Sequence, residues 1–301
     1  GFLSYVLQIL NSLMMISNIF MMMTRSLASG KRILEVIDEE IDIREDKAKD
    51  IEVTRGEIVF DHVYFKYKKE APEYVLSDMH LKIPAGSTVG IVGQTGSAKT
   101  TLVQLIPRLY EVTEGSVLID GKTVDQYPLK TLRDAVAVVL QKNTLFSGTL
   151  RENLLWGNPN ATQRELDEAC RIAGVDEFLG RLEKGYDTEM GQGGVNVSGG
   201  QKQRICIARA ILKKPKVLIL DDSTSAVDTA TEARIRSQLA EFLPHMTKIV
   251  IAQRISSVRH ADFIVVLDDG RIQGIGTHEE LLESNRIYQE IYESQKEGVD
   301  L

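Results

Sequence analysis

The chain has 301 residues, of which 43% are hydrophobic and 26% charged, and its formal net charge at pH 7 is −7. This length allows one large domain or two smaller ones with a sizeable core. The negative balance argues against nucleic acid as a partner, because phosphate backbones bind to basic surfaces. Two distant cysteines, Cys170 and Cys206, argue against a disulfide framework or a zinc site and favour a reducing compartment.

The first element is an apolar segment, residues 2–23, without a single charge. It is longer than the roughly 20 helical residues that span a bilayer, and it lacks the basic start and small-residue cleavage site of a signal peptide. Arg25, Lys31 and Arg32 follow it, which puts this end on the cytoplasmic side of a membrane. We therefore predict a membrane-spanning helix in contact with the lipid bilayer. The alternative is a buried helix of a soluble core.

The remaining boundaries follow from charge and hydrophobic patterning. We expect residues 1–30 to end a longer, multi-pass transmembrane domain, residues 31–55 to form a helical extension and charged linker, and residues 296–301 to be a tail. Between them, residues 56–295 alternate apolar runs with helical patterns, which indicates an α/β fold with a mostly parallel sheet. The predicted strands are 56–67, 87–92, 116–119, 135–140, 216–220, 248–252 and 263–267, and the predicted helices are 100–110, 162–174 and 201–214.

A glycine-rich loop, within STVGIVGQTGSAKTTL at residues 87–102, joins a predicted strand to a predicted helix. Gly93, Lys99 and Thr100 match the phosphate-binding pattern G-x-x-x-x-G-K-[ST], but Ala98 replaces its last glycine. Loop N–H groups and the lysine suit phosphate, and the threonine suits Mg²⁺. A methyl group at residue 98 would crowd the loop if φ is positive there. The expected nucleotide-binding residues are Gly93, Gln94, Thr95, Gly96, Ser97, Ala98, Lys99, Thr100 and Thr101.

Two adjacent carboxylates end the apolar run VLILDD at residues 217–222. A carboxylate at the end of a buried strand beside a phosphate loop can hold Mg²⁺ through its water shell, and we assign that role to Asp221. The alternative is an aspartate that caps a turn with Ser223.

The segment VNVSGGQKQRICIARAIL, residues 195–212, opens a predicted helix with exposed backbone N–H groups at Ser198, Gly199 and Gly200. Together with the phosphate loop and LILDD, in this order and spacing, the SGGQ sequence closely resembles the signature of ATP-binding cassette (ABC) proteins. The resemblance covers essentially all of residues 56–295 and the apolar segment before them.

The resemblance implies a P-loop NTPase core with helices on both faces of the sheet, an antiparallel β subdomain and an α-helical signature subdomain. It implies ATP and Mg²⁺ as ligands, and a dimer in which the SGGQ of one chain closes on the ATP of the other. The residues that it assigns are Tyr67, stacking on adenine; Gln141, touching Mg²⁺ and sensing the transmembrane domain; Asp228, in the loop that crosses the dimer; and Ser198, Gly199, Gly200 and Gln201 of the signature. The alternative for Tyr67 is an aromatic residue packed within a strand.

With Ala98 of the phosphate loop, two further residues depart from the family's pattern within the composite ATP site, and a third, Gln192, departs outside it. Asp222 stands where the family usually has the glutamate that polarises the attacking water, and Gln253 stands where it has a histidine. Losing one methylene retracts a carboxylate by about 1.5 Å, and a neutral amide cannot carry a proton. Gln192 stands in GQGG where exporters commonly show GERG, in a segment that contacts the membrane domain. We expect Asp222, Gln253 and Lys99 to govern a slow hydrolysis.

These observations predict a subunit of a multidrug-type ABC exporter in the cell membrane, with its ATP-binding domain in the cytoplasm. Its own site would bind ATP but hydrolyse it slowly, while its SGGQ would complete the active site of a different subunit in a heterodimer. The alternatives are a slow homodimeric ABC ATPase and a regulatory ATP-dependent clamp that transports nothing. A DNA-repair ATPase with the same signature is disfavoured by the apolar segment and the acidic balance.

Overall fold

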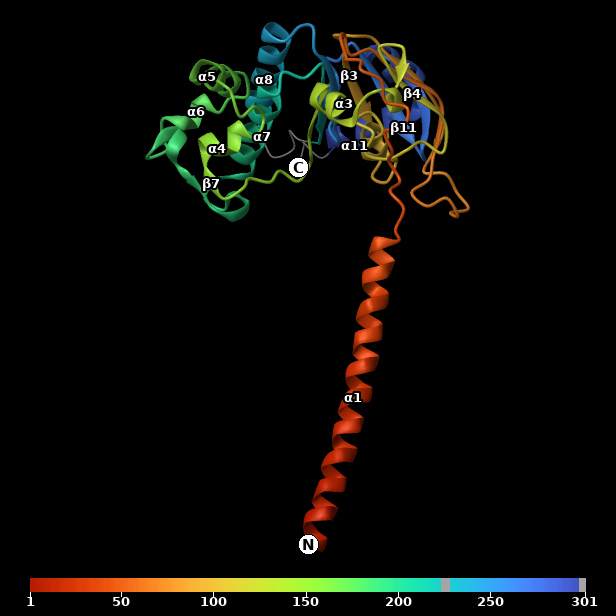
Figure 1. Ribbon diagram of the computed structural model, residues 1–301. Coiled ribbons are helices and arrows are strands. Elements are labelled where there is room, and N and C mark those ends of the chain that lie inside the picture. The colour runs from red at the N-terminus through yellow and green to blue at the C-terminus, as the bar shows by residue number, and fades with distance from the viewer. Residues whose placement is uncertain (223–227, 298–301) are drawn as a thin grey trace. The chain divides into compact units, whose positions relative to one another are not determined.

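The computed structural model describes residues 1–222 and 228–297. The chain divides into two units, Gly1–Arg44 and Glu45–Leu301, and Figure 1 labels their elements. Ser223, which the alternative interpretation of the aspartate pair involves, lies outside the described residues, as do residues 298–301 of the predicted tail.

The first unit consists mainly of one helix, α1 (Phe2–Ile37), with no buried residue. Its length and hydropathy suffice to cross a membrane. The helix continues without a break beyond residue 30, where the membrane segment was expected to end, because the basic residues that follow are compatible with helical structure. Residues 38–50, the charged segment, form neither helix nor strand.

A six-stranded sheet forms the centre of the second unit, in the order β12-β11-β3-β10-β9-β6. The first five strands in chain order, β3 (Thr88–Val92), β6 (Val136–Val139), β9 (Val217–Asp221), β10 (Thr247–Ile251) and β11 (Phe263–Asp268), run parallel, and β12 (Arg271–Gly276) pairs antiparallel with β11. Alternate residues of β9 enter different hydrophobic clusters, Val217 and Ile219 one and Leu218 and Leu220 another. Both faces of the sheet are therefore covered, as continuous apolar strands require.

An antiparallel sheet in the order β2-β1-β4-β5 packs against one face of this core. Its strands are β1 (Ile58–Phe65), β2 (Leu76–Ile83), β4 (Glu114–Ile119) and β5 (Lys122–Thr123). Phe60 of β1 and Ile119 of β4 lie in one cluster with Val89 of β3, so the two sheets share a hydrophobic core. The strand predicted at 116–119 thus belongs to the antiparallel sheet rather than to the parallel one.

Helices cover the opposite face. Figure 1 shows α4 to α8 grouped on one side of the sheets. The principal members are α5 (Gln163–Ile172), α7 (Gly199–Leu212) and α8 (Thr229–Phe242), and their buried residues form a cluster with Leu218 and Leu220 of β9. The other elements are α2 (Lys99–Gln104), η1 (Val124–Gln126), α3 (Leu129–Ala135), β7 (Gly148–Thr149), α4 (Leu150–Leu155), α6 (Asp176–Leu179), η2 (Gly185–Asp187), β8 (Glu189–Met190), η3 (Gln192–Gly194), α9 (Ile255–Val258), α10 (His278–Ser284) and α11 (Arg286–Glu297).

One predicted helix is much shorter than expected. The pattern at residues 100–110 predicted a helix through Tyr110, but α2 ends at Gln104. Pro107 lacks an N–H group and its ring disfavours helical continuation from the preceding turn. The chain then makes turns up to Arg108, whose positive φ of 52° excludes a right-handed helix.

Asp120 anchors the entry to the antiparallel sheet. Its carboxylate accepts hydrogen bonds of 2.7–3.0 Å from the four backbone N–H groups of residues 54–57. Burial alone would raise the pKa of Asp120, but hydrogen bonds from the N–H groups of Arg55, Thr54 and Glu57 have a larger effect. The pKa of Asp120 therefore lies below its ordinary value. The carboxylate therefore stabilises the fold above the pKa of the unfolded chain, and this contribution is lost as the pH falls through the lower, folded pKa.

Asp120→Asn should destabilise the protein by about 1–2 kcal/mol at pH 7, because an amide cannot accept all four bonds and the partial exposure of the site weakens each of them. Asparagine tolerates the positive φ of 50° at this turn, so the change isolates the charge. Urea unfolding at neutral and acidic pH measures the effect. The difference between the two proteins should shrink toward zero in acid, and an equal difference at both pH values would contradict the assignment.

Candidate nucleotide-binding site

The candidate site lies where four neighbouring parallel strands end. The phosphate loop follows β3, Gln253 follows β10, the aspartate pair ends β9, and Gln141 follows β6. Because β3, β10, β9 and β6 are adjacent and parallel, their carboxyl ends meet at one edge of the sheet. Sites for ligands in open α/β sheets form at this edge.

At Gly93 the phosphate loop lies so close to a neighbouring strand that no side chain would fit. A Cβ atom at Gly93 would lie 2.1 Å from the backbone oxygen of Leu267, and Gly96 has a positive φ of 88°. Ala98 adopts φ 67° and ψ 23°, the left-handed conformation. The backbone at residue 98 therefore has the positive φ at which a methyl group was expected to crowd the loop. This left-handed conformation costs alanine about 1–2 kcal/mol more than it would cost glycine.

Lys99 folds back onto the loop. Its ammonium group donates to the backbone oxygens of Gly93 and Gln94, both at 2.8 Å, and to Ser97 Oγ at 3.2 Å. Burial lowers the pKa of Lys99, and the charges of Asp221 and Asp222 oppose that change. A half-buried cation surrounded by loop carbonyls is positioned to turn toward an anion held by the same loop.

Thr100 and Asp221 form a pair of oxygen donors. The Thr100 hydroxyl lies 2.9 and 3.2 Å from the two carboxylate oxygens of Asp221. Burial raises the pKa of Asp221, whereas the Thr100 hydrogen bond and the Lys99 charge lower it. Hydroxyl and carboxylate oxygens are the ligands that Mg²⁺ prefers, so this chemistry fits the expected ion.

Asp222 is held by two amides. Its Oδ2 atom accepts hydrogen bonds from Nε2 of Gln141 at 2.9 Å and from Nε2 of Gln253 at 2.7 Å. The residue is 8% exposed, and burial followed by the charge of Asp221 raises its pKa, against the effects of Gln141, Gln253 and Lys99. The three residues were singled out separately from the sequence. That the two glutamines bind the same carboxylate oxygen follows only from the arrangement of strand ends.

Tyr67 lies beside the phosphate loop. Its hydroxyl is 2.8 Å from Thr101 Oγ1, although the two residues are far apart in the chain. The ring packs edge-on against Phe65 and Tyr110 and remains 51% exposed, which leaves aromatic surface for a planar partner.

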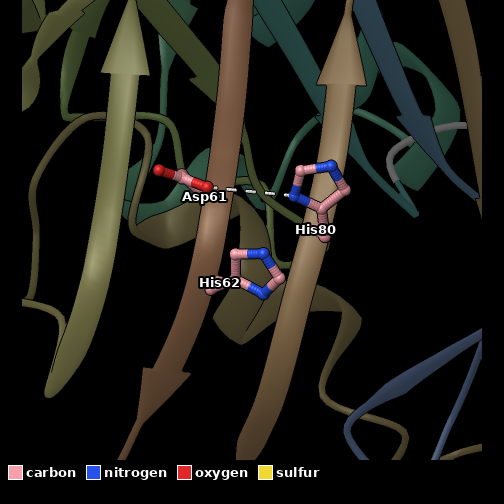
Figure 2. Close-up of side chains that lie close together, drawn as sticks. All are labelled: Asp61, His62 and His80. Atoms are coloured by element: carbon pink, nitrogen blue, oxygen red, sulfur yellow. Dashed lines mark ion pairs between the residues drawn. The ribbon is translucent and has the colours of Figure 1, made fainter.

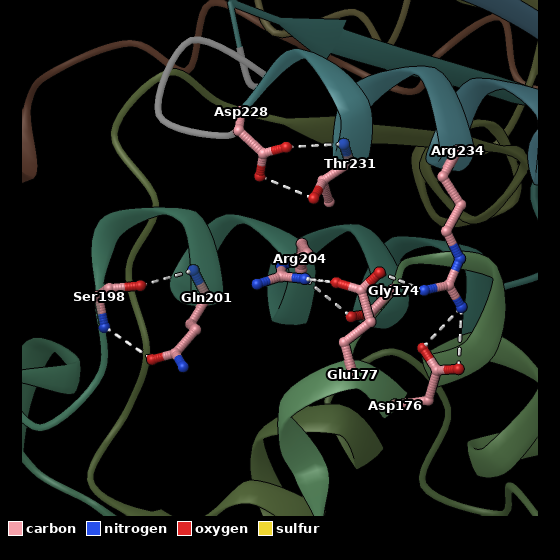
Figure 3. A network of polar contacts seen from close by, with 9 residues as sticks. All are labelled: Gly174, Asp176, Glu177, Ser198, Gln201, Arg204, Asp228, Thr231 and Arg234. Carbon is pink, nitrogen blue, oxygen red and sulfur yellow. Dashed lines mark hydrogen bonds and ion pairs between the residues drawn. The ribbon is translucent and has the colours of Figure 1, made fainter. Parts of the chain in front are cut away.

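The signature residues lie at the head of α7. Ser198 is its N-cap and exchanges hydrogen bonds with Gln201 in a capping box, while Ser198 and Gly199 are exposed. Asp228 is the N-cap of α8 and accepts from Thr231 N and Thr231 Oγ1, which lowers its pKa. Figure 3 shows both caps. No hydrogen bond links either residue to the phosphate loop within the described part of the chain.

A salt-bridge network that the sequence analysis missed joins these two helices. Glu177 of α6 binds Arg204 of α7 through one carboxylate oxygen and Arg234 of α8 through the other, and Arg234 also binds Asp176 (Figure 3). The four residues are spread over three helices, so no local motif in the sequence marks them.

The fold and the edge-of-sheet cluster define a P-loop nucleotide-binding protein. Residues 76–225 match the family model described as "ABC transporter". The chain thus contains the ATP-binding domain of an ABC transporter, a family of ATPases that drive transport, and ATP with Mg²⁺ is the ligand that such a domain implies.

Two relatives and one solved structure illustrate the similarity. The chain is 43% identical over 293 residues to the ABC transporter ATP-binding protein YfiB of Bacillus subtilis. This alignment covers 97% of this chain and 50% of the relative. It is 44% identical over 265 residues to a putative multidrug export ATP-binding/permease protein of Staphylococcus aureus, covering 87% and 46%. A bacterial Atm1-family ABC exporter solved with ATP bound superposes with a TM-score of 0.84 at 36% identity, over 91% of this chain and 48% of the other. The chain therefore spans about half the length of these proteins.

Proposed function

We propose that the chain is the ATP-binding part of a membrane ABC exporter subunit whose own ATP site hydrolyses slowly. The single observation that carries the slow site is the position of the Asp222 carboxylate, which both Gln141 and Gln253 hold close to the strand ends. A general base must come within about 2.6–3.2 Å of the water that it activates. An aspartate is shorter than a glutamate by about 1.5 Å, and a displacement of about 1 Å can lower a rate a hundredfold.

The remaining residues of the site bind and orient the nucleotide. The loop N–H groups from Gly93 to Thr101 and the Lys99 ammonium would hold the phosphates, and the Tyr67 ring would stack on adenine. Mg²⁺ would be held by Thr100, Asp221 and Gln141, and it would neutralise charge on the phosphates. The amide nitrogen of Gln141 is used by Asp222, which leaves its amide oxygen for the ion.

The signature would act on a second subunit. Ser198, Gly199, Gly200 and Gln201, all among the described residues, make no hydrogen bond with the chain's own phosphate loop. The N–H groups of Gly199 and Gly200 at the start of α7 suit a γ-phosphate, whereas those of Ser198, expected from the sequence to be exposed, and of Gln201 are used in the capping box. Asp228 would lie at the same dimer contact. A partner with a glutamate and a histidine in place of Asp222 and Gln253 would then supply the faster site, which makes the proposed assembly a heterodimer.

Membrane export rests on three further observations. Helix α1 is long and apolar enough to cross a bilayer, its basic end favours a cytoplasmic ATP-binding domain, and a relative is named a putative multidrug export ATP-binding/permease protein. Gln192, the exposed first residue of η3, would face the membrane domain and weaken the coupling that a charged residue provides.

Purification of the tagged full-length protein from its native membrane, followed by the mass of the intact complex, tests this proposal. We expect a second, different subunit. A homodimer would contradict the heterodimer and require Asp222 to be assayed as a slow base. An isolated monomer with no transmembrane partner would contradict the exporter itself.

A further inference from the structure

Four polar side chains gather on the exposed face of the antiparallel sheet, and none of them is among the residues assigned to the nucleotide site. They are Asp61 and His62 of β1 and Asp78 and His80 of β2. Figure 2 shows Asp61, His62 and His80 pointing toward one another from the two strands. A nitrogen or oxygen from each of these three lies within 4.8 Å of the others. We call these three the histidine cluster.

Two β-bulges create this arrangement. The pairs Phe60↔Leu81 and Val63↔Met79 leave Asp61 and His62 together opposite His80 alone. His62 accordingly takes a positive φ of 48°. In a regular strand consecutive side chains point to opposite faces, but a bulge turns two in succession the same way. Asp61 and His62 are therefore both exposed, while the flanking Phe60 and Val63 are buried.

A second bulge, in β2, brings Asp78 against His62. The pairs Val63↔Met79 and Phe65↔Leu76 leave Ser77 and Asp78 opposite one residue, and Asp78 has a φ of 50°. Its Oδ1 atom lies 2.6 Å from Nδ1 of His62. A carboxylate on one ring nitrogen fixes the ring and its tautomer and makes the other nitrogen a better metal ligand.

The backbone beneath the cluster is held firmly. A Cβ atom at Gly115 of β4 would lie 2.2 Å from the backbone oxygen of His62, so the neighbouring strand is packed directly against the bulge. Val63 and Met79, which point inward at the same positions, are completely buried. Sites built on sheet strands keep their ligand geometry better than sites on loops.

The donor set selects the kind of ion. Two imidazoles and a carboxylate suit borderline divalent ions such as Zn²⁺, whereas Mg²⁺ and Ca²⁺ prefer oxygen ligands alone. Tetrahedral ligands at about 2.0–2.1 Å from zinc lie roughly 3.4 Å apart. The Asp61 Oδ1 to His80 Nδ1 distance is 3.9 Å, and the His62 and His80 rings stack with centroids 4.9 Å apart. Small rotations of exposed side chains close the remaining gap.

We propose that Asp61, His62 and His80 form a surface binding site for Zn²⁺ or a similar divalent transition ion, with Asp78 positioning His62 and water completing the coordination. The sequence argued against a zinc site because its two cysteines lie far apart. The proposed site contains no cysteine ligand, so that argument does not apply to it. The binding partner is the free ion, and the site is independent of the nucleotide.

Isothermal titration of Zn²⁺ into the full-length protein tests the site. The protein is purified in detergent without a histidine tag, treated with chelator and kept free of nucleotide. We expect one equivalent to bind. His80→Ala and His62→Gln should each weaken it at least tenfold, and Asp78→Asn roughly 10–100-fold, as positioning carboxylates do in metal sites. His245→Ala, at an exposed histidine outside the cluster, should leave binding unchanged.

Cu²⁺ electron paramagnetic resonance of the unaltered protein provides a test that needs no variant. Coupling to two imidazole nitrogens is the expected signal. No binding by the unaltered protein, equal binding by the His80→Ala and unaltered proteins, or a spectrum with oxygen ligands only would overturn the proposal. The cluster would then be a hydrogen-bonded surface group and nothing more.

Discussion

Ser198→Arg should abolish most ATP turnover by the assembled transporter, whereas Lys99→Ala should leave a substantial part of it. Ser198 caps α7 at an exposed helix end, and a long cationic side chain there would occupy the space of the partner's γ-phosphate. In the proposed dimer Lys99 would serve the chain's own site alone, and its loss should weaken ATP binding there by about 10–100-fold, the value of one or two charge-assisted hydrogen bonds. Steady-state ATPase assays of the complex in proteoliposomes and binding of a fluorescent nucleotide measure the two effects.

Ser198→Ala is the matched control, because it removes the same capping hydroxyl without adding bulk or charge. Loss of a cap destabilises a helix by about 1 kcal/mol, and most turnover should survive this change. Equal losses from Ser198→Arg and Lys99→Ala would contradict the division between a slow site on this chain and a faster one completed by its signature.

Combining Asp222→Glu with Gln253→His should raise the turnover of the complex tenfold or more at the site of this chain. The added methylene would extend the carboxylate by about 1.5 Å, and the imidazole can carry the proton that an amide cannot. Moving a catalytic group by about 1 Å into its correct position can raise the rate of hydrolysis a hundredfold. Single-turnover hydrolysis separates this site from the partner's when the partner's phosphate-loop lysine is replaced by alanine.

Two controls isolate the geometry. Asp222→Asn keeps the shape but removes the charge and should produce no gain. Gln253→His alone leaves the carboxylate short and should produce little. An unchanged rate in the double variant, with nucleotide still bound, would show that these two residues do not limit hydrolysis and that the slow-site proposal is wrong.

Much of the fold was predictable because its signals are local. The apolar runs at 216–220, 248–252 and 263–267 appear as β9, β10 and β11 with boundaries shifted by at most a residue or so. The glycine-rich loop lies between β3 and α2 as expected. Its residues lie with Asp221 at the strand ends because neighbouring parallel strands place their carboxyl ends together. Tyr67 reaches the loop from the end of β1 in the antiparallel sheet, through its contact with Thr101.

Other features depend on contacts that no short segment encodes. The early end of α2 reflects Pro107, which outweighs the helical periodicity around it. The two hydrogen bonds from Gln141 and Gln253 to Asp222 form only because the ends of three strands lie side by side in the folded sheet. The histidine cluster depends on two bulges, and a bulge reverses the facing of every later residue, so alternation read from the sequence places His62 on the wrong side. The nucleotide-binding roles of individual residues stay predictions.

Glu177 has a consequence for the contact that this chain would make with the other subunit of the proposed dimer. One carboxylate binds Arg204 of the helix that Ser198 begins and Arg234 of the helix that Asp228 begins. The helices that begin with the two residues expected to touch the other subunit are therefore joined through the Glu177 carboxylate, with Asp176 as a further partner of Arg234. Loss of the partner's ATP from the Ser198 end would therefore also disturb the Asp228 end, so the two parts of this dimer contact would loosen together.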